Sequence, residues 1–160
     1  GGAQTTAKEM AWGRASGRDF AIHASVEVLE DPSGGGWRRA APMARPRMGH
    51  SLCACGGKLY AIGGTSDFVT ACGSVECWHA EAGSWALMTA TCPWGNHSSV
   101  PAGGRIYVLG GIARVETGTP ATRRSQRLDP AVGKWEDLPE MVSARSSFCS
   151  VCVKLAALAI

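Results

Sequence analysis

Long hydrophobic runs are absent from this sequence of 160 residues. A helix that crosses a bilayer needs about 20 mostly apolar residues, and the longest candidate, residues 155–160, is far shorter. The first residues, Gly1-Gly2-Ala3-Gln4, have neither the basic region nor the apolar region of a secretory signal peptide. These absences predict a protein without a membrane partner.

A strong excess of charge of one sign is missing as well. The chain has 16 Lys and Arg against 13 Asp and Glu, a formal net charge of +3. Its basic residues are scattered, with small pairs at Arg38-Arg39 and Arg123-Arg124. Nucleic-acid-binding proteins usually concentrate basic residues on one face or stripe, often among aromatic residues. The sequence therefore predicts no nucleic-acid partner.

Recognisable catalytic patterns are also lacking. No Ser-His-Asp or paired-carboxylate arrangement stands out, and no Gly-rich loop carries the Lys-Ser or Lys-Thr ending of a phosphate loop. Cys53 and Cys55 share one side of an expected strand, and Cys149 and Cys152 recur at the same place in the last unit. Because no second pair with zinc-finger spacing follows, we interpret the thiols as core residues. We predict no enzyme, no catalytic residue, no cofactor and no metal.

The cysteine count indicates the cellular compartment. Seven cysteines are an odd number in a chain without a visible secretory signal. Free thiols in a reducing compartment explain this count better than a disulfide framework does. We therefore expect a cytoplasmic location.

One stretch occurs twice and gives the chain its organisation. Residues 57–64, GKLYAIGG, return 47 positions later as residues 104–111, GRIYVLGG. Each copy has a short run of β-forming residues around a tyrosine, Tyr60 or Tyr107, and ends in a glycine pair. The pairs are Gly63-Gly64 and Gly110-Gly111. A strand that ends in a double glycine is the repeated unit.

Other landmarks keep nearly the same period. Trp37, Trp85 and Trp135 are 48 and 50 residues apart, and His50 and His97 are 47 apart. We interpret the tryptophans as packing residues between repeats, because ring stacking and area burial explain their spacing without a ligand. A period of about 50 with glycine pairs and a tryptophan is typical of propeller blades.

The pattern of apolar runs and turn residues predicts short antiparallel strands in each unit. The expected strands are residues 26–29, a strand opening at Trp37, 51–55, 58–62, 75–78, 85–88, 97–100, 105–109, 125–128, 135–138 and an inner strand within 146–153. Tight turns fall at Gly56-Gly57, Ala82-Gly83 and Gly103-Gly104. Four consecutive strands make one blade.

Three phrases of the sequence, residues 41–51, 59–64 and 133–141, resemble kelch repeats. The resemblance covers nearly all of residues 26–155 and is closest to the propeller part of BTB-kelch proteins. It implies an all-β fold, a kelch β-propeller that here forms an incomplete ring of four-stranded antiparallel blades. We expect a fragment of a longer protein, by resemblance a six-bladed one. Its parts are a partial blade with a long N-terminal loop (1–40), two kelch blades (41–90 and 91–141) and a partial blade of inner strands (142–160).

The resemblance also implies a function. Kelch propellers mostly bind other proteins, and a large group of them recruits substrates to cullin-type E3 ubiquitin ligases. Two alternatives stay open. One is an actin-binding or cytoskeletal scaffold. The other is a kelch-type copper oxidase, for which Tyr, His and Cys ligands would have to gather at the propeller centre. Tyr60 and Tyr107 are the two tyrosines of the chain, and packing explains both.

Loop lengths indicate where a partner would bind. In an up-and-down blade, the loops after the second and fourth strands share one face, and these loops are long and varied here. Binding residues tend to lie on loops held by a rigid scaffold. On this face, just before the first strands of the blades, are Arg45, Arg47, Asn96 and Arg145. Arginines there suit a protein partner with an acidic peptide segment, because the guanidinium matches carboxylates. The alternative is that they are solvated or bind backbone carbonyls.

Overall fold

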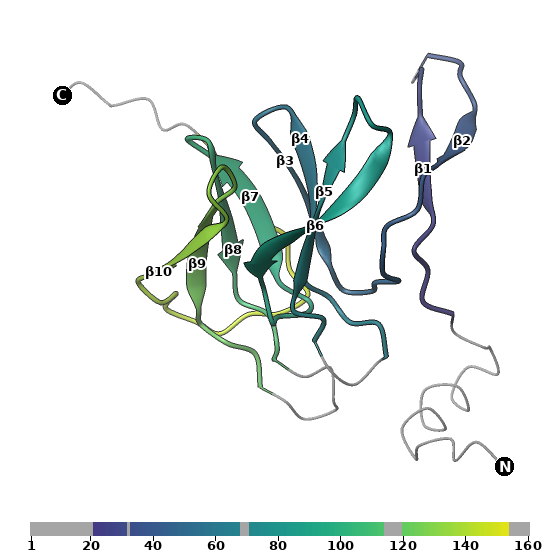
Figure 1. Cartoon of the computed structure of the whole chain (residues 1–160). Coiled ribbons are helices and arrows are strands. Elements are labelled where there is room, and N and C mark those ends of the chain that lie inside the picture. Colours follow the sequence, from purple (N-terminus) through teal and green to yellow (C-terminus); the bar gives the residue numbers. More distant parts are fainter. Residues whose placement is uncertain (1–20, 32, 68–70, 114–119, 154–160) are drawn as a thin grey trace, which may run out of the picture.

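The computed structural model describes residues 21–31, 33–67, 71–113 and 120–153, and these form ten strands and no helix. The strands build one two-stranded and two four-stranded antiparallel sheets (Figure 1). Two predicted segments, the long loop up to residue 20 and the apolar residues 155–160, lie outside the described residues. The prediction of an all-β fold with four-stranded blades is confirmed, and the ring is not closed.

The first complete sheet, which we call blade 1, has the strand order β3-β4-β5-β6. Its strands are β3 (Ser51–Cys55), β4 (Lys58–Ile62), β5 (Ser74–His79) and β6 (Ser84–Thr91). Gly56 and Gly57 have positive φ angles of 57° and 74°. Glycine adopts these angles without strain, so β3 turns directly into β4. Between β5 and β6 the register shifts between Ser74 and Glu76, a β-bulge that the sequence did not predict.

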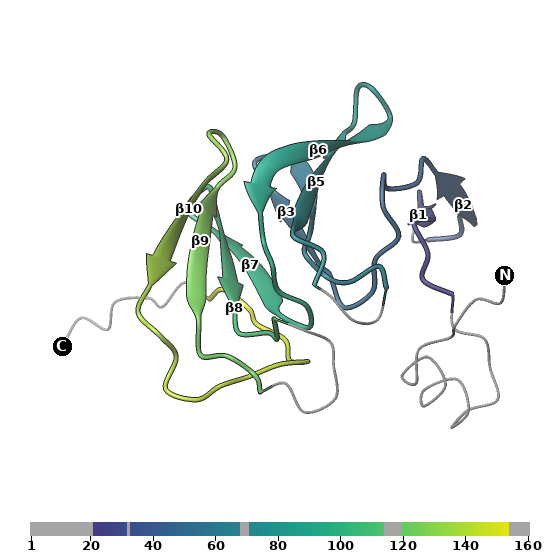
Figure 2. The same ribbon diagram turned by 60° about the horizontal axis from the view of Figure 1, so that its bottom comes forward.

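The second complete sheet, blade 2, repeats this arrangement, with β7 innermost and β10 outermost. Its strands are β7 (Ser98–Ala102), β8 (Arg105–Leu109), β9 (Ser125–Asp129) and β10 (Lys134–Leu138). Figure 2 shows the two blades fanning out side by side from the ends where their loops gather. The inner strands are in contact across the blades, because β3 touches both β7 and β8.

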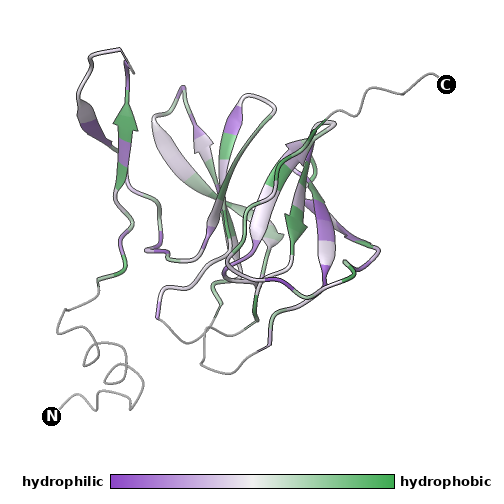
Figure 3. Cartoon of the chain, turned by 180° about the vertical axis from the view of Figure 1, so that it is seen from behind, coloured by the Kyte–Doolittle hydropathy of each residue, from purple (hydrophilic) through white to green (hydrophobic). Residues whose placement is uncertain are grey.

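The remaining hairpin, β1 (Val26–Leu29) with β2 (Trp37–Ala40), corresponds to the outer two strands of a blade. We call it the half-blade. It stands beyond blade 1, on the side away from blade 2 (Figure 1). Figure 3 shows hydrophobic positions along β1, although Val28 and Leu29 are more than a third exposed.

One predicted strand is absent. Residues 146–153 were expected to begin the inner strands of another blade, but they form no strand. The Ser150 N–H donates to the Ser98 hydroxyl at 2.9 Å instead of to a backbone carbonyl. A strand requires a neighbour along its edge, and this segment forms no backbone ladder with any of the described strands.

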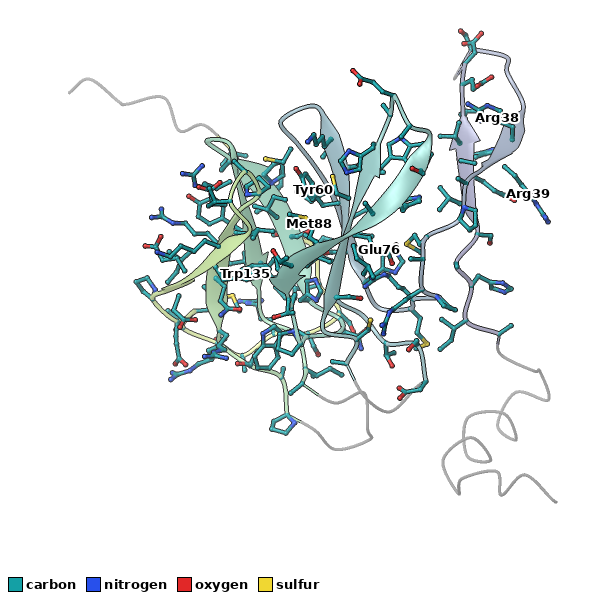
Figure 4. All side chains as sticks on the ribbon, in the orientation of Figure 1. Arg38, Arg39, Tyr60, Glu76, Met88 and Trp135 are labelled. Atoms are coloured by element: carbon teal, nitrogen blue, oxygen red, sulfur yellow. The ribbon has the colours of Figure 1, made fainter. Side chains whose placement is uncertain are left out.

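The core lies between blade 1 and blade 2. Blade 2 contributes Ile106, Val108 and Leu128, and blade 1 with the residue just after β6 contributes the others, Cys53, Cys55, Tyr60, Ile62, Val75, Cys77, Ala90 and Cys92. Partners across antiparallel strands share a face, so the register that pairs Cys53 with Tyr60 and Tyr60 with Cys77 places all three on one side. Figure 4 shows Tyr60, Met88 and Trp135 in this region.

The predicted packing tryptophans face the preceding blade. Trp135 packs against the core from blade 2, and Trp85 contacts Trp78 with ring centroids 5.5 Å apart and ring planes inclined by 58°. Trp37 departs from the prediction, because its side chain is 68% exposed. Its position in the half-blade corresponds to Trp85, so its ring faces a side on which none of the described strands lies.

Candidate functional site

Long loops meet at one end of both blades and are held together by backbone hydrogen bonds. Met48 and Thr65 exchange two hydrogen bonds of 2.9 Å, and Gly95 and Ile112 do the same at 3.0 and 2.9 Å. Further along, the Arg145 N–H donates to the Thr122 carbonyl at 3.2 Å. Thus the segments before the first strands and those after the second strands form one connected surface, which we call the long-loop face.

At the centre of this face, equivalent residues of successive repeats are linked in a row. The Asn96 N–H donates to the Gly49 carbonyl at 2.7 Å, and the Ser147 N–H donates to the Asn96 carbonyl at 2.8 Å. All three residues are left-handed, with φ angles of 62° for Gly49 and 53° for Asn96 and Ser147. Left-handed backbone is uncommon outside glycine, and Asn tolerates it best. The row fixes how each blade starts relative to its neighbour.

The glycine pairs that end the second strands lie directly under the next repeat. A Cβ on Gly63 (φ 60°) would overlap the Trp94 carbonyl oxygen, and one on Gly110 (φ 63°) would overlap that of Arg145. The second glycines bind the same carbonyls, since the Gly64 N–H donates to Trp94 and the Gly111 N–H to Arg145. Both the angle and the close approach require glycine, so these pairs join blades and hold no ligand in this geometry.

Arg47, one of the predicted partner-binding residues, is buried inside blade 1. Its side chain has no exposed surface, and its Nη2 lies 2.7 Å from Glu76 Oε1. Nε also donates to Glu76, Nη1 donates to the carbonyls of Gly63 and Ser74, and Nη2 donates to the Ser74 hydroxyl. All five N–H donors of the guanidinium are therefore used within the blade. Arg47 therefore follows the alternative interpretation, in which an arginine binds backbone carbonyls of its own blade. Its guanidinium has no N–H donor left for a partner.

Glu76 anchors the segment that precedes the first strand. Besides Arg47, its carboxylate accepts from the backbone N–H of Ala44 at 2.6 Å and of Arg45 at 3.3 Å. It is fully buried, and Figure 4 places it toward the loop end of blade 1. The sequence analysis gave it no role. An isolated buried carboxylate would be very unfavourable, so its four hydrogen bonds hold the fold together at this point.

Blade 2 fills the same two positions with different residues. Arg47 lies two residues before Gly49 and Trp94 two residues before Asn96, so Trp94 takes the position of Arg47. The strand register places Gln126 where Glu76 stands in blade 1. The Arg124 guanidinium lies over the Trp94 ring, 5.5 Å from its centroid. The Gln126 amide donates to Asp137 at 2.8 Å.

The other predicted partner residues lie closer to solvent. Arg45 and Arg145 are exposed and Asn96 is half-buried. Within the described residues, neither arginine has a side-chain ion pair. Arg123 and Arg124 lie on the same face, with side chains 54% and 48% exposed. The sequence analysis noted Arg123-Arg124 only as a small basic pair and gave Trp94 no role, so it missed their position on this face.

The two repeat-equivalent histidines lie beneath the long-loop face. His97 Nε2 and the Ser51 hydroxyl are 2.8 Å apart, a hydrogen bond between β3 of blade 1 and the residue just before β7 of blade 2. Burial lowers the pKa of His97 to about 4 and, together with Arg47, also lowers the pKa of His50. Both rings are therefore neutral at pH 7 and serve packing.

The thiols give no metal site. No group of three or more His, Cys, Asp or Glu side chains is placed to hold a metal within the part of the chain that the structure describes. Burial raises the pKa of Cys53 to about 11 and that of Cys92 to about 12, as for inert core thiols. Cys149 and Cys152 differ from the prediction, because both are exposed. They lie on the segment that forms no strand.

Comparison with known proteins decides the family. A model of the Kelch motif matches residues 46–89 and 93–142, more than half of the chain. The chain belongs to the kelch-repeat family. In this kelch chain the two matched segments correspond to blade 1 and blade 2 together with most of the segments that lead into them.

Several kelch proteins are similar to this chain. Kelch-like protein 36 of Mus musculus is 28% identical over 123 residues, 73% of this chain and 20% of that protein. Kelch repeat and BTB domain-containing protein 8 of Danio rerio is 40% identical over 83 residues, 49% of this chain and 14% of that protein. Alpha-scruin of Limulus polyphemus is 32% identical over 103 residues, 63% of this chain and 11% of that protein. The kelch chain spans about a fifth or less of the length of these relatives.

In the residues that the structure places, we find no helix with the length and apolar character needed to span a bilayer.

Proposed function

We propose that this kelch segment is a protein-interaction module that binds a partner through its long-loop face and has no enzymatic role. The observation that carries the proposal is the set of exposed cations and one aromatic ring on that face. The residues are Arg45, Arg123, Arg124 and Trp94, next to the half-buried Asn96. Arginine and tryptophan are the residues that most often dominate binding energy at protein interfaces.

We propose further that the partner presents an acidic peptide segment. The Arg45 guanidinium has no carboxylate partner among the described residues. Arg123 and Arg124 each lie near one carboxylate, of Glu140 and Asp137, and their side chains stay about half exposed. An acidic segment would supply carboxylates that the guanidinium groups bind in pairs of hydrogen bonds. Arg47 does not belong to this surface, because Glu76 already binds it.

For the longer protein, we propose substrate recognition in a cullin-type E3 ubiquitin ligase, acting in the cytoplasm. Two observations support it: relatives of this chain carry BTB domains in their names, and all seven cysteines are free thiols. Coprecipitation of a cullin with the full-length protein tests the ligase role. Cosedimentation of the chain with actin filaments, without cullin binding, would instead favour the cytoskeletal role.

A peptide titration tests the binding surface. The probe is a fluorescent peptide of alternating glutamate and glycine, compared with one in which glutamine replaces glutamate. We expect the acidic peptide alone to raise the fluorescence anisotropy, and Arg45→Glu or Arg124→Glu to weaken binding about tenfold each. Lys58→Glu makes the same charge change at the tight-turn end of blade 1 and should leave binding unchanged. Equal losses in all three variants would mean that net charge, and not this face, attracts the peptide.

A further inference from the structure

The last strands of the three sheets, β2, β6 and β10, differ in charge at one repeated place. Each carries one of the repeat tryptophans, and the two residues that follow the tryptophan are Arg38-Arg39 in β2, Ala86-Leu87 in β6 and Glu136-Asp137 in β10. The three pairs are equivalent, because the second residue of each lies opposite the position that Glu76 fills in blade 1. At this place β2 is therefore basic, β10 is acidic and β6 has no charge.

The outer edge of β6 is open and unprotected. Its sequence, SWALMTAT, contains no charged residue, and its neighbour in the sheet is β5 alone (Figure 2). Among the described residues, no backbone hydrogen bond outside the strand ladders involves residues 84–91. Proteins usually protect such an edge from strand addition with charged side chains, as β2 and β10 do here. The β-bulge lies beyond Leu87, so residues 84–87 form a regular edge with free N–H and C=O groups.

A groove lies beside this regular edge, between blade 1 and the half-blade. Its volume is about 450 Å³, and its lining includes Val28 and Arg38 of the half-blade together with Trp78 and Trp85 of blade 1. Leu87 is two residues after Trp85, so both side chains lie on the same face of β6, and Leu87 is 52% exposed. The groove side of β6 is therefore apolar, and the opposite wall presents a cation.

Arg38 has donors left for a further carboxylate. Its Nε donates to Glu30 at the surface, and its side chain is 56% exposed. Its two Nη groups donate to no acceptor among the residues that the structure describes. A guanidinium binds a carboxylate best through two parallel N–H groups, so an acidic side chain in the groove complements Arg38. Apolar walls and one cation together fit a chain that carries apolar and acidic side chains on one face.

We propose that β6 binds an extended segment of a protein partner, which adds a fifth strand to blade 1. The backbone of the segment pairs with residues 84–87. Its alternate side chains face the groove, with an apolar residue against Leu87 and an acidic residue, two positions away, toward Arg38. In this mode of recognition the main-chain hydrogen bonds provide affinity, and the pockets for alternate side chains provide specificity. The site goes beyond the proposed function, because it shares no residue with the partner surface on the long-loop face.

A synthetic peptide tests the pairing of the backbone. The probe is a fluorescent peptide, Thr-Val-Thr-Val-Thr-Glu-Thr, which places both valines and the glutamate on one face and the glutamate near one end. We expect it to raise the fluorescence anisotropy with the complete 160-residue chain. Two versions carry N-methyl groups, one on the threonines and the other on the valines and glutamate, so that each loses the N–H groups of one edge. One version should bind like the parent peptide, and the other should bind at least about tenfold more weakly.

Substitutions in the chain locate the site. Leu87→Asp gives β6 the residue that β10 has at this place, and we expect it to weaken binding of the peptide and of its glutamine version about tenfold each. Leu52→Asp is the matched control, because Leu52 lies in the same row and on the same face of blade 1, but in the innermost strand. It should leave binding unchanged. Both leucines are more than half exposed, so circular dichroism should show an unchanged fold. Arg38→Glu should remove the preference for glutamate over glutamine.

Four outcomes would overturn the proposal. They are no binding at millimolar peptide, equal affinity of the two N-methylated versions, equal losses in Leu87→Asp and Leu52→Asp, and a dimer in light scattering that Leu87→Asp dissociates. The last result would mean that a second copy of the chain occupies the edge. Arg45→Glu, which tests the long-loop face, should leave binding of this peptide unchanged, so the two proposals fail separately.

Discussion

Blade 1 and blade 2 have the same strand order but secure the segment before their first strand by different chemistry. In blade 1 the fully buried pair Arg47–Glu76 binds that segment from inside the sheet. In blade 2 the large ring of Trp94 takes the arginine position, under the Arg124 guanidinium, and a neutral Gln126 replaces the carboxylate. The fold requires that these positions be filled, and it accepts either an ion pair or an aromatic ring.

The difference has energetic consequences. A buried ion pair contributes little net stability, because desolvation offsets the attraction, but removal of one partner leaves a buried charge alone. An aromatic ring half-buried under a cation has no such vulnerability. We therefore expect blade 1 to respond to single substitutions much more strongly than blade 2.

The largest effect should follow from Glu76→Ala. The substitution leaves the Arg47 guanidinium buried without its carboxylate and removes the acceptor of two backbone N–H groups. We expect the free energy of unfolding to fall by about 3–5 kcal/mol. Gln126→Ala, at the same position in blade 2, should lower it by less than about 1 kcal/mol. Urea unfolding measures both, and similar losses would contradict the contrast between the blades.

The next effect concerns the junction between the blades. Gly63→Ala places a Cβ against the Trp94 carbonyl at a φ of 60°, and we expect a loss of about 3 kcal/mol. Gly56→Ala is the control, because its φ is 57° and a Cβ there meets no atom within 4 Å. Gly56→Ala should lower the free energy of unfolding by only about 1 kcal/mol, because the left-handed angle alone is unfavourable for alanine. Equal losses in the two variants would show that the close contact across the blades is unimportant.

Acid should weaken the same junction through His97. Its pKa is about 4 in the fold because of burial, against an ordinary value of 6.5. The unfolded chain therefore binds more protons between these values, so stability is complete above pH 6.5 and falls as the pH drops toward 4. The loss attributable to His97 reaches about 3 kcal/mol. Thermal unfolding of the natural chain and of His97→Gln across this range measures it, and an unchanged slope in the variant would refute this assignment.

The smallest loss of stability should come from the contact between Arg124 and the Trp94 ring in blade 2. Arg124→Ala should lower the free energy of unfolding by about 0.5–1 kcal/mol, the usual worth of a partly exposed cation over an indole. In a Trp94→Leu background, the same change should have almost no effect. A double-mutant cycle in urea measures this coupling, and a large loss in the leucine background would show that Arg124 acts through other contacts.

The sequence predicted the framework well, because the framework depends on local chemistry that repeats. The strands at 51–55, 58–62 and 105–109 were predicted with the bounds that the structure has, since glycine pairs mark both ends of the last two and the end of the first. The inner strand within 146–153 was predicted from the repeat and does not form. Strand formation depends on a neighbour, and a sequence repeat cannot tell whether that neighbour is present.

The sequence did not predict which of the arginines before the first strand is buried and which is exposed. Arg45 and Arg47 stand two residues apart, yet one is exposed and the other is buried with every donor bound. The decision rests on Glu76, which is 29 residues away from Arg47 in the chain and reaches it through the order of the strands. The repeat offers a clue, because Glu76 and Gln126 occupy one position and Arg47 and Trp94 another. Both positions differ between the two blades, but the contact between Arg47 and Glu76 becomes evident only from the strand order.

The natural cysteines allow the separation of blade 1 and blade 2 to be measured by thiol labelling. Cys53, Cys55 and Cys77 are enclosed between blade 1 and blade 2, whereas Cys149 and Cys152 are open to solvent. A thiol-directed label can modify the three enclosed cysteines only when the two blades separate, whereas it modifies the two exposed cysteines directly. The ratio of the two labelling rates therefore reports how often the blades open, in a protein that needs no engineered probe.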